Sequence, residues 1–540
     1  MIMEVKKFKK VLVANRGEIA IRVFRALSEL GIGSVAVYSK EDRYALFRTK
    51  ADEAYPLNPD KGPVDAYLDI PKIIRIAKEK KVDAIHPGYG FLSENPEFAE
   101  ACRKNDIVFI GPNVDAMNIM GDKISAKRAA EESRVPIIDG SDFIIHDVDT
   151  AMKIADEIGY PVMLKASNGG GGRGMRIVQS QEEMEEAFEK SRNESKRVFG
   201  EAKLFIEKYL IHPKHIEVQI LGDNYGNIVH LYDRDCSLQR RNQKVIEFAP
   251  AWSISEETRK KILDSAKRLA RRVGYTGTME FLVDEEEHPY FIEMNPRIQV
   301  EHTVTEMVTG IDIVICQILI AEGYPLNSPT IHIYSQNEIK CTGYALQARV
   351  TTEDPANHFL PDTGKIDLYR SGSGGGIRLD GGTAYTGAVI TPHYDSLLVK
   401  VISHDRTFEN AIHKSVRALK ELRIHGVKTN ITFLINVLNH ETFHKGKCFT
   451  TFIEETPELF ELHYKLDRTT KILEFLANKM VNVNPGPKPF LENRKVPVID
   501  TERKLFGTRD EFLRLGAKEF TQKVYRSDKL YVTDTTMRDG

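Results

Sequence analysis

Polar and apolar residues alternate strictly from 293 to 301 in the segment "FIEMNPRIQVEH". Successive residues of an extended chain point to opposite sides, so one side carries only hydrogen-bonding groups. An ordinary half-exposed strand also alternates, but it usually turns Thr, Ser or Lys outward. The pattern therefore favours a ligand-binding edge over a solvated strand. Its polar members are Glu293, Asn295, Arg297, Gln299 and Glu301.

The same segment forms one arm of a predicted β-hairpin with strands at 279–283 and 290–295 around a polar turn at 284–289. If Val283 pairs with Tyr290, Glu280 lies directly opposite Glu293. Two carboxylates with β-carbons about 5 Å apart repel each other. A divalent cation between them turns that cost into a binding site, and Asn295 lies on the same face. The hairpin therefore predicts a magnesium site.

A glycine-rich loop, "KASNGGGGRGM" (165–175), is the second candidate for chemistry. A dinucleotide-binding turn requires a helix directly after the glycines, but "MRIVQS" has the pattern of a strand and the helix begins only near Ser180. No G-x-x-x-x-G-K-[ST] motif occurs. The remaining alternatives are a flexible surface hairpin and a loop whose N–H groups cover a phosphate chain, with Lys165 neutralising it.

A phosphate loop and a metal pair in one region together indicate phosphoryl transfer, in which positioning and charge neutralisation dominate. The guanidinium of Arg297 offers a fork suited to a small planar anion. Glu301, close to that arginine, is a candidate general base.

The elements that must position these groups differ along the chain. Strands near 9–15, 34–39 and 82–88 alternate with helices near 16–31 and 68–81, which predicts a parallel α/β domain over roughly the first 120 residues. From about 135 to 230 the pattern is of strands joined by short turns, with a hairpin at 215–235. A third region of short strands ends near 450. A polar helical segment and the linker-like "VNPGPKPF" follow.

Composition restricts the class of protein. The 540 residues include 76 basic and 78 acidic ones, a balance that argues against a nucleic-acid or membrane-surface binder. Five scattered cysteines without a C-x-x-C pair suit a reducing compartment. The most apolar helix-length segment, 310–323, contains Asp312 and Gln317 and is too short to span a bilayer. We therefore expect a cytoplasmic protein without nucleic-acid or membrane partners.

Four segments together resemble one family, the ATP-grasp biotin carboxylases: "KASNGGGGRGM", "FIEKYL", "RDCSLQRRNQKVIE" and "FIEMNPRIQVEHTVTE". The resemblance extends from about residue 8 to 450. Within the family, "NPRIQVEHTVTE" and "QARVTTEDP" are more similar to pyruvate carboxylases than to acyl-CoA carboxylases. The final "VTDTTMRDG" resembles the opening of a carboxyltransferase barrel, so we expect the N-terminal portion of a larger enzyme.

The resemblance implies an α/β and α+β multidomain chain with an ATP-grasp fold. The implied domains are an N-terminal α/β domain (1–122), an ATP-grasp domain (123–330) with a glycine-rich lid (135–205), a C-terminal mixed β/α domain (331–455), a linker or allosteric-type segment (456–530) and the first strand of a carboxyltransferase domain (531–540).

It also implies the reaction: ATP phosphorylates bicarbonate, and the resulting carboxyphosphate or CO2 carboxylates N1 of biotin. The implied nucleotide contacts are Lys123 and Lys165 on the phosphates, Gly169, Gly170, Gly171 and Gly172 closing over them, Glu207, Lys208 and Leu210 around the adenosine, and His215 and Gln239 completing the pocket. The implied magnesium or manganese ligands are Glu280 and Glu293, with Asn295 nearby. The implied bicarbonate ligands are Lys244, Arg297, Gln299 and Val300, with Glu301 as the base. Arg349 would stabilise the biotin enolate, and Tyr89 would line the ureido pocket.

The implied partners are a biotin carboxyl carrier domain and a carboxyltransferase domain, to which Asp539 could contribute a metal ligand. A dimer of biotin carboxylase domains and a tetrameric complete enzyme, making oxaloacetate from pyruvate, are also implied. Three alternatives remain: the biotin carboxylase of an acyl-CoA carboxylase, another ATP-grasp ligase joining a carboxylate to an amine, and a non-catalytic nucleotide-binding subunit.

One position departs from the family. "QRRNQK" has Asn242 where the family usually has histidine, so one nucleotide contact cannot carry charge. Two other motifs have ordinary interpretations. Lys153, in "AMKI", lies in a helical pattern and is expected to be a solvated helix lysine. The glycines at 374–376 are expected to form a turn between strands.

Overall fold

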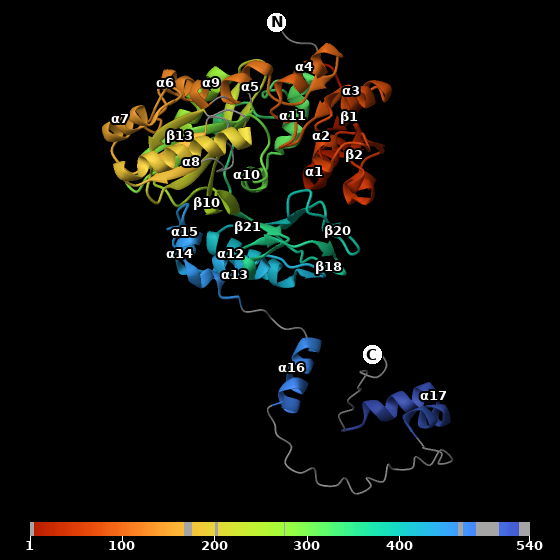
Figure 1. Cartoon of the computed structure of the whole chain (residues 1–540). Helices are drawn as coiled ribbons and strands as arrows, with labels where there is room; N and C mark the ends of the chain where they lie inside the picture. The colour runs from red at the N-terminus through yellow and green to blue at the C-terminus, as the bar shows by residue number, and fades with distance from the viewer. Residues whose placement is uncertain are drawn as a thin grey trace. The chain divides into compact units, whose positions relative to one another are not determined.

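The computed structural model describes residues 5–121, 123–166, 175–199, 203–274, 276–462, 468–481 and 507–528 (Figure 1). The chain divides into two compact units, Met1–Tyr464 and Lys465–Gly540. The second unit contains α16 (Arg468–Val481) and α17 (Thr508–Tyr525). The four glycines at 169–172, Asp539 and the strand expected at 531–540 lie outside the described residues.

The N-terminal region is the predicted parallel α/β domain, built on a five-stranded sheet in the order β3-β2-β1-β4-β5. Gly17, at φ +63°, makes the tight turn from β1 into α1, a conformation that favours glycine. The strands are β1 (Lys10–Val13), β2 (Gly33–Tyr38), β3 (Glu53–Pro56), β4 (Ala84–His86) and β5 (Val108–Phe109). The helices are α1 (Gly17–Glu29), α2 (Pro63–Tyr67), α3 (Ile70–Glu79), α4 (Pro96–Lys104) and α5 (Val114–Gly121).

A small antiparallel sheet, β7-β6-β8, follows α6 (Lys123–Glu132). Its strands are β6 (Val162–Ala166), β7 (Met175–Val178) and β8 (Leu204–Lys208). The strand expected after the glycine loop is thus confirmed as β7. Two helices, α7 (Val148–Ile158) and α8 (Gln181–Phe199), pack on this sheet and on each other. Lys153 is exposed on α7, as predicted.

The central element is an eight-stranded sheet in the order β13-β12-β9-β10-β11-β14-β21-β19. It continues across residue 330, because β11 pairs antiparallel with β14. The early strands are β9 (Lys214–Gly222), β10 (Ile228–Arg240), β11 (Gln243–Ala249), β12 (Gly277–Val283) and β13 (Pro289–Asn295). The later ones are β14 (Tyr344–Thr351), β19 (Ile377–Gly381) and β21 (Leu397–Asp405). The hairpin expected at 215–235 is formed by β9 and β10.

The β12–β13 register corrects one prediction and confirms another. Val283 pairs with Pro289, not with Tyr290, whose partner is Leu282. A bulge between the two halves of the hairpin inserts one extra residue into β13, so that Glu280 still pairs with Glu293. The facing carboxylates are therefore present, although the pairing near the turn is shifted by one.

Helices cover the central sheet. The helix α9 (Glu256–Val273) packs on β9 and β10, and α12 (Phe408–Glu421) packs on β14 and β21 (Figure 1). The apolar segment at 310–323 forms the buried helix α11 (Ile313–Glu322), which follows α10 (His302–Thr309) and packs against α1. In the described chain, no single helix has the length and hydropathy to cross a membrane; α10 and α11 reach these values only as a pair bent by 92°.

Short strands and helices complete the third region. Glycines 374–376 lie in a turn between β18 and β19, as predicted. All five cysteines are free thiols. The strands are β15 (Glu353–Asp354), β16 (Leu360–Pro361), β17 (Gly364–Lys365), β18 (Leu368–Arg370), β20 (Val389–Ile390) and β22 (Arg423–His425). The helices are α13 (Ile431–Asn439), α14 (Glu441–His444) and α15 (Phe452–Glu455).

Candidate active site

One cleft of about 1010 Å³ lies where the N-terminal sheet, the small sheet and the central sheet meet. Every described residue of the predicted site lines it, although these residues span positions 89 to 349. The nucleotide and metal candidates in it are Lys123, Lys165, Glu207, Lys208, Leu210, His215, Gln239, Glu280, Glu293 and Asn295. The bicarbonate and biotin candidates in it are Tyr89, Lys244, Arg297, Gln299, Val300, Glu301 and Arg349.

At one end of the cleft, the carboxylate of Glu207 on β8 pairs with two lysines, Lys127 (2.5 Å) and Lys165. Burial opposes its ionisation, but the two ammonium groups lower its pKa to about 2. Burial and Lys165 lower the pKa of Lys123. This cationic cluster suits a phosphate chain. Sequence reasoning missed Lys127, although it lies one helical turn after Lys123 on α6 and so shares its face.

Lys208, one of the adenosine candidates, uses its ammonium group to bond to the backbone. The ammonium of Lys208 donates to the carbonyls of Gly159 (2.8 Å) and Tyr160 (3.1 Å). Its side chain is therefore bonded to the backbone between the end of α7 and the start of β6. Asn242 lies in the turn between β10 and β11 with φ +62° and lines the same cleft.

Two rows of polar residues cross the central sheet beneath the cleft. In the first row, Arg234, Glu217, Glu280 and Glu293 are successive partners on β10, β9, β12 and β13. In the second row, Gln219 pairs with Thr278, and Thr278 with Asn295. Three carboxylates side by side on adjacent strands destabilise a sheet unless cations balance them. Such an arrangement is typical of a functional site.

The predicted metal ligands converge. The amide of Asn295 lies 2.8 Å from Oε1 of Glu280 and 3.2 Å from Oε1 of Glu293. Facing carboxylates supply the hard oxygen ligands that magnesium prefers, usually one or two carboxylates plus phosphates, whereas the amide of Asn295 turns its NH2 group to them and its oxygen to Arg297. The residues present therefore fit a magnesium or manganese ion beside the phosphate cluster.

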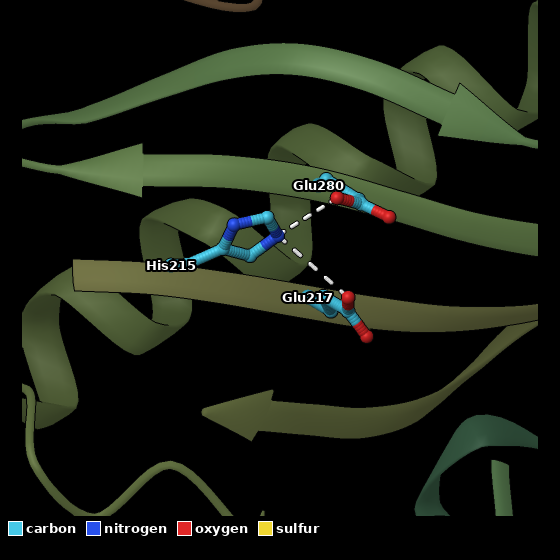
Figure 2. A group of neighbouring side chains, drawn as sticks. All are labelled: His215, Glu217 and Glu280. Carbon is cyan, nitrogen blue, oxygen red and sulfur yellow. Dashed lines mark ion pairs between the residues drawn. The ribbon is translucent and has the colours of Figure 1, made fainter. Parts of the chain in front are cut away.

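The ring of His215 lies beside two of these carboxylates, Glu280 and Glu217, as Figure 2 shows. Its Nε2 lies 2.7 Å from Oε2 of Glu280 and 3.7 Å from Oε1 of Glu217. The amide of Gln239 donates to Nδ1 (2.9 Å), which leaves Nε2 as the protonated nitrogen facing the carboxylates.

Lys244 lies at the centre of the cleft, against three carboxylates. Its Nζ pairs with Glu217, with Glu280 (3.2 Å) and with Glu301 (3.0 Å). Burial opposes protonation, but these neighbours raise the pKa of Lys244 well above its usual value. Glu217 is the most enclosed of them, and burial raises its pKa. The lysine is therefore a fixed positive charge.

Glu301 is held from both sides, because Arg349 on β14 donates to its second oxygen (3.0 Å). Arg349 also pairs with the buried carboxylate of Glu247. Burial would raise the pKa of Glu301, but Lys244 and Arg349 lower it well below the usual range. The carboxylate is thus ionised at any working pH. Nearby, Arg297 donates to Glu94 (2.8 Å) and to Asn295 (2.8 Å).

At the far end, Tyr89 donates to Glu18 (2.9 Å), which pairs with Lys400 (2.8 Å). Lys400 also donates to the carbonyl of Val300 (3.1 Å). The candidate biotin and bicarbonate residues are thereby connected. Sequence reasoning missed Glu18 and Lys400, because one follows β1 and the other lies on β21, with nothing local to join them.

Comparisons with known proteins agree with this geometry. Three family models match: "Biotin carboxylase, N-terminal domain" over 7–117, "Carbamoyl-phosphate synthase L chain, ATP binding domain" over 122–329 and "Biotin carboxylase C-terminal domain" over 347–455. The biotin carboxylase domain dimer of Hydrogenobacter thermophilus 2-oxoglutarate carboxylase, in complex with MgADP, ADP and bicarbonate, is 47% identical with a TM-score of 0.81, covering 85% of this chain and 100% of that one. The chain belongs to the biotin carboxylase family of ATP-grasp ligases.

Among full-length relatives, the chain is similar to pyruvate carboxylases. That of Bacillus subtilis is 52% identical over 545 residues, which cover 100% of this chain and 47% of the relative. The structure of the Rhizobium etli pyruvate carboxylase with the allosteric activator acetyl coenzyme-A is 47% identical with a TM-score of 0.82, covering 98% of this chain and 48% of that one. The chain thus spans about half the length of these relatives.

Proposed function

We propose that this chain carboxylates biotin with bicarbonate and ATP, releasing ADP and phosphate. The observation that carries the proposal is the position of Glu301, held between Lys244 and Arg349 in the cleft that also contains the paired carboxylates Glu280 and Glu293. One cleft thus contains a base, an anion site, a pair of metal ligands and a cationic end for the phosphates. This combination suits the activation of bicarbonate by ATP.

Glu301 accepts the proton of bicarbonate in this proposal. Two observations support this role: Glu301 is ionised, and it contacts Lys244, a cation that attracts the substrate anion. Arg297, Gln299 and the backbone of Val300 complete the bicarbonate contacts. The deprotonated bicarbonate oxygen then forms a bond to the γ-phosphorus as the bond to ADP breaks, giving carboxyphosphate.

The nucleotide is held by the cationic end of the cleft. Lys123 and Lys165 bind its phosphates, and Glu280 and Glu293, with Asn295, hold the divalent cation. When bound, that cation neutralises the charge on the transferred phosphoryl group. The closure of glycines 169–172 over the phosphates remains an expectation from the sequence.

Biotin occupies the end of the cleft formed by Arg349 and Tyr89. Loss of CO2 from carboxyphosphate leaves a phosphate that accepts the N1 proton of biotin. The guanidinium of Arg349 stabilises the resulting enolate, and N1 then bonds to the CO2. The support for this assignment is that Arg349 touches Glu301 while Tyr89 lines the same cleft.

The complete enzyme is a further proposal. The full-length relatives favour pyruvate as the acceptor, giving oxaloacetate, with carrier and carboxyltransferase domains as partners. The matching 2-oxoglutarate carboxylase domain indicates that this half-reaction serves more than one acceptor. We also propose the domain limits given above, dimerisation of the biotin carboxylase part, a tetrameric whole and a cytoplasmic location, which the free cysteines support.

The test is ADP release from MgATP and bicarbonate, with and without free biotin, together with transfer of labelled bicarbonate carbon to biotin. We expect biotin to stimulate ADP release and carboxybiotin to form. Tight ATP binding without biotin stimulation, in this chain and in one that also includes the proposed carrier and carboxyltransferase domains, would reject the proposal.

A further inference from the structure

Among the described residues, Arg234 on β10 is the largest fully buried side chain, with an exposure of 0%. It lies beneath the cleft and does not line it. Burying a guanidinium is costly unless it is paired and hydrogen-bonded throughout. A guanidinium buried beneath this cleft is therefore a candidate for a specific role in the site.

All five N–H groups of Arg234 are used. Nε donates to Glu217 (2.9 Å). Nη1 donates to Gln219 (2.9 Å) and Thr305 (3.0 Å), and Nη2 donates to Thr278 (3.0 Å) and Gln299 (2.8 Å). A guanidinium has five donors in a fixed planar fork and does not lose its proton in proteins. The direction of every bond in this network is therefore fixed.

This fixed direction determines how Gln299 is oriented. Its carbonyl must face Arg234, which only donates, so its NH2 group faces the carboxylate of Glu280, 2.7 Å away. Glu217 is fixed in the same way. One of its oxygens accepts from Arg234, and the other contacts Lys244.

The contact with Thr305 adds a third connection. Thr305 belongs to α10, which begins at His302, directly after Glu301. Arg234 thus bonds to Glu217 and Gln299, which lie beneath the proposed bicarbonate site. Through Thr305 it also bonds to α10, the helix that follows the proposed base. Its partners come from β9, β12, α10 and the segment 296–301.

We propose that Arg234 is a positioning residue for bicarbonate activation, acting through Gln299 and Glu217 to orient the groups that bind bicarbonate. The inference rests on the proposed function. The lysines that bind the ATP phosphates do not depend on Arg234, because Lys123 and Lys165 lie on α6 and β6, which contribute no partner to its network. The network reaches the ATP site at the proposed metal ligand Glu280, to which Gln299 donates.

The test compares the KM for bicarbonate with the KM for MgATP in Arg234→Lys. Lysine keeps the charge but cannot reproduce the planar fork. We expect the KM for bicarbonate to rise at least ten-fold and kcat to fall, while the KM for MgATP stays within two-fold. In a protein that already carries Gln299→Ala, Arg234→Lys should raise the KM for bicarbonate little further. The effects of two residues that act through one contact are not additive.

A second variant keeps the test decisive if Arg234→Lys does not fold. Thr305→Val removes one hydrogen bond and leaves the guanidinium in place, and it should raise the KM for bicarbonate about three-fold. Thr276→Val is the matched control, because Thr276 is a similarly buried threonine whose hydroxyl, among the residues that the structure describes, bonds to the backbone of Gly222. It should lower the melting temperature without moving either KM.

A Thr305→Val protein with both KM values unchanged, or with both raised equally, would overturn the inference and leave Arg234 a purely structural residue. Absence of bicarbonate-dependent ADP release from the unsubstituted chain would instead reject the proposed function itself. The two failures are therefore distinguishable.

Discussion

The two oxygens of Glu301 face two different cations: Oε1 lies 3.0 Å from Nζ of Lys244, and Oε2 lies 3.0 Å from Nη2 of Arg349. Both cations lower the pKa of Glu301, so it is a weak base in this arrangement. In the proposed mechanism its basicity would increase when Lys244 turns to bicarbonate and Arg349 to biotin, since each cation would then share its charge with a substrate. The mechanism thereby predicts that proton transfer is coupled to substrate binding.

Glu301→Gln tests this role. The amide is nearly isosteric with the carboxylate but cannot accept the proton, so we expect bicarbonate-dependent ADP release to fall by about 10²- to 10⁴-fold. ATP affinity should remain within a few-fold, because the phosphate end of the cleft is unchanged. Initial rates and nucleotide titration measure the two effects. Unchanged turnover would remove Glu301 from the mechanism.

A substitution of Arg349 should reduce the carboxylation of biotin and leave nucleotide binding nearly unchanged. Loss of the arginine leaves the buried carboxylate of Glu247 without its cation, so Arg349→Lys is the better variant because it retains the charge. We expect formation of carboxybiotin to fall at least 100-fold, as expected for the loss of a positioned donor to a developing oxyanion. Nucleotide affinity should be little changed.

The measurement is transfer of labelled carbon to biotin beside equilibrium binding of ADP. Arg240→Lys is a suitable control, because it also lines the cleft but donates to the carbonyl of His358 (2.8 Å) rather than to Glu301. Equal losses of carboxylation and nucleotide affinity in the Arg349 variant would contradict its assignment to biotin.

The sequence predicted those parts of the site that local patterns determine. Alternation and turn signals placed Glu280 opposite Glu293, and the polar side of 293–301 does face the cleft. The predicted pairing near the turn was wrong by one residue. The bulge adds one residue to β13, and the alternating pattern gave no sign of it. Glu280 and Glu293 were paired correctly, although the pairing was counted from Val283 and Tyr290, which are not partners.

Long-range contacts lay beyond this reasoning. Glu18 and Lys400 are 382 positions apart, yet they form one ion pair between Tyr89 and Val300. Arg234 stood within a predicted hairpin, but alternation assigns it only to a face of a strand. Its importance arises from partners on β9, β12 and α10, and only the tertiary fold brings these together.

Acid sensitivity should reveal the Glu207 cluster. The pKa of Glu207 in the folded protein is about 2, below its usual 4.5. Its carboxylate therefore stabilises the fold fully above about pH 5, and this contribution is lost as the pH falls toward 2. The difference in unfolding free energy between the unsubstituted protein and Glu207→Gln should shrink by roughly 1 kcal/mol between pH 7 and pH 4.

Denaturant unfolding at several pH values measures this difference. Glu257→Gln is the control, because Glu257 pairs with Lys261 on the exposed face of α9, where an ion pair contributes little. Its difference from the unsubstituted protein should stay nearly constant. A constant difference for Glu207→Gln as well would mean that Lys127 and Lys165 do not hold its carboxylate ionised.

The departure at Asn242 predicts a gain of affinity. Asn242 lines the cleft at φ +62°, in a backbone region where both asparagine and histidine are enriched. Asn242→His should therefore fold normally and supply a donor that carries charge when protonated. We expect the KM for MgATP to fall about two- to five-fold at pH 6, because charge-assisted hydrogen bonds are the stronger ones.

The pH dependence distinguishes a charge effect from a packing effect. Histidine titrates near pH 6.5, so the gain should largely disappear by pH 8, whereas a packing effect would persist. Lys81→His is the control, since Lys81 is exposed at φ +53° outside the cleft. A KM for MgATP that is the same in Asn242→His and in the unsubstituted protein at both pH values would show that this position does not touch the nucleotide. The family's histidine would then act on something other than ATP.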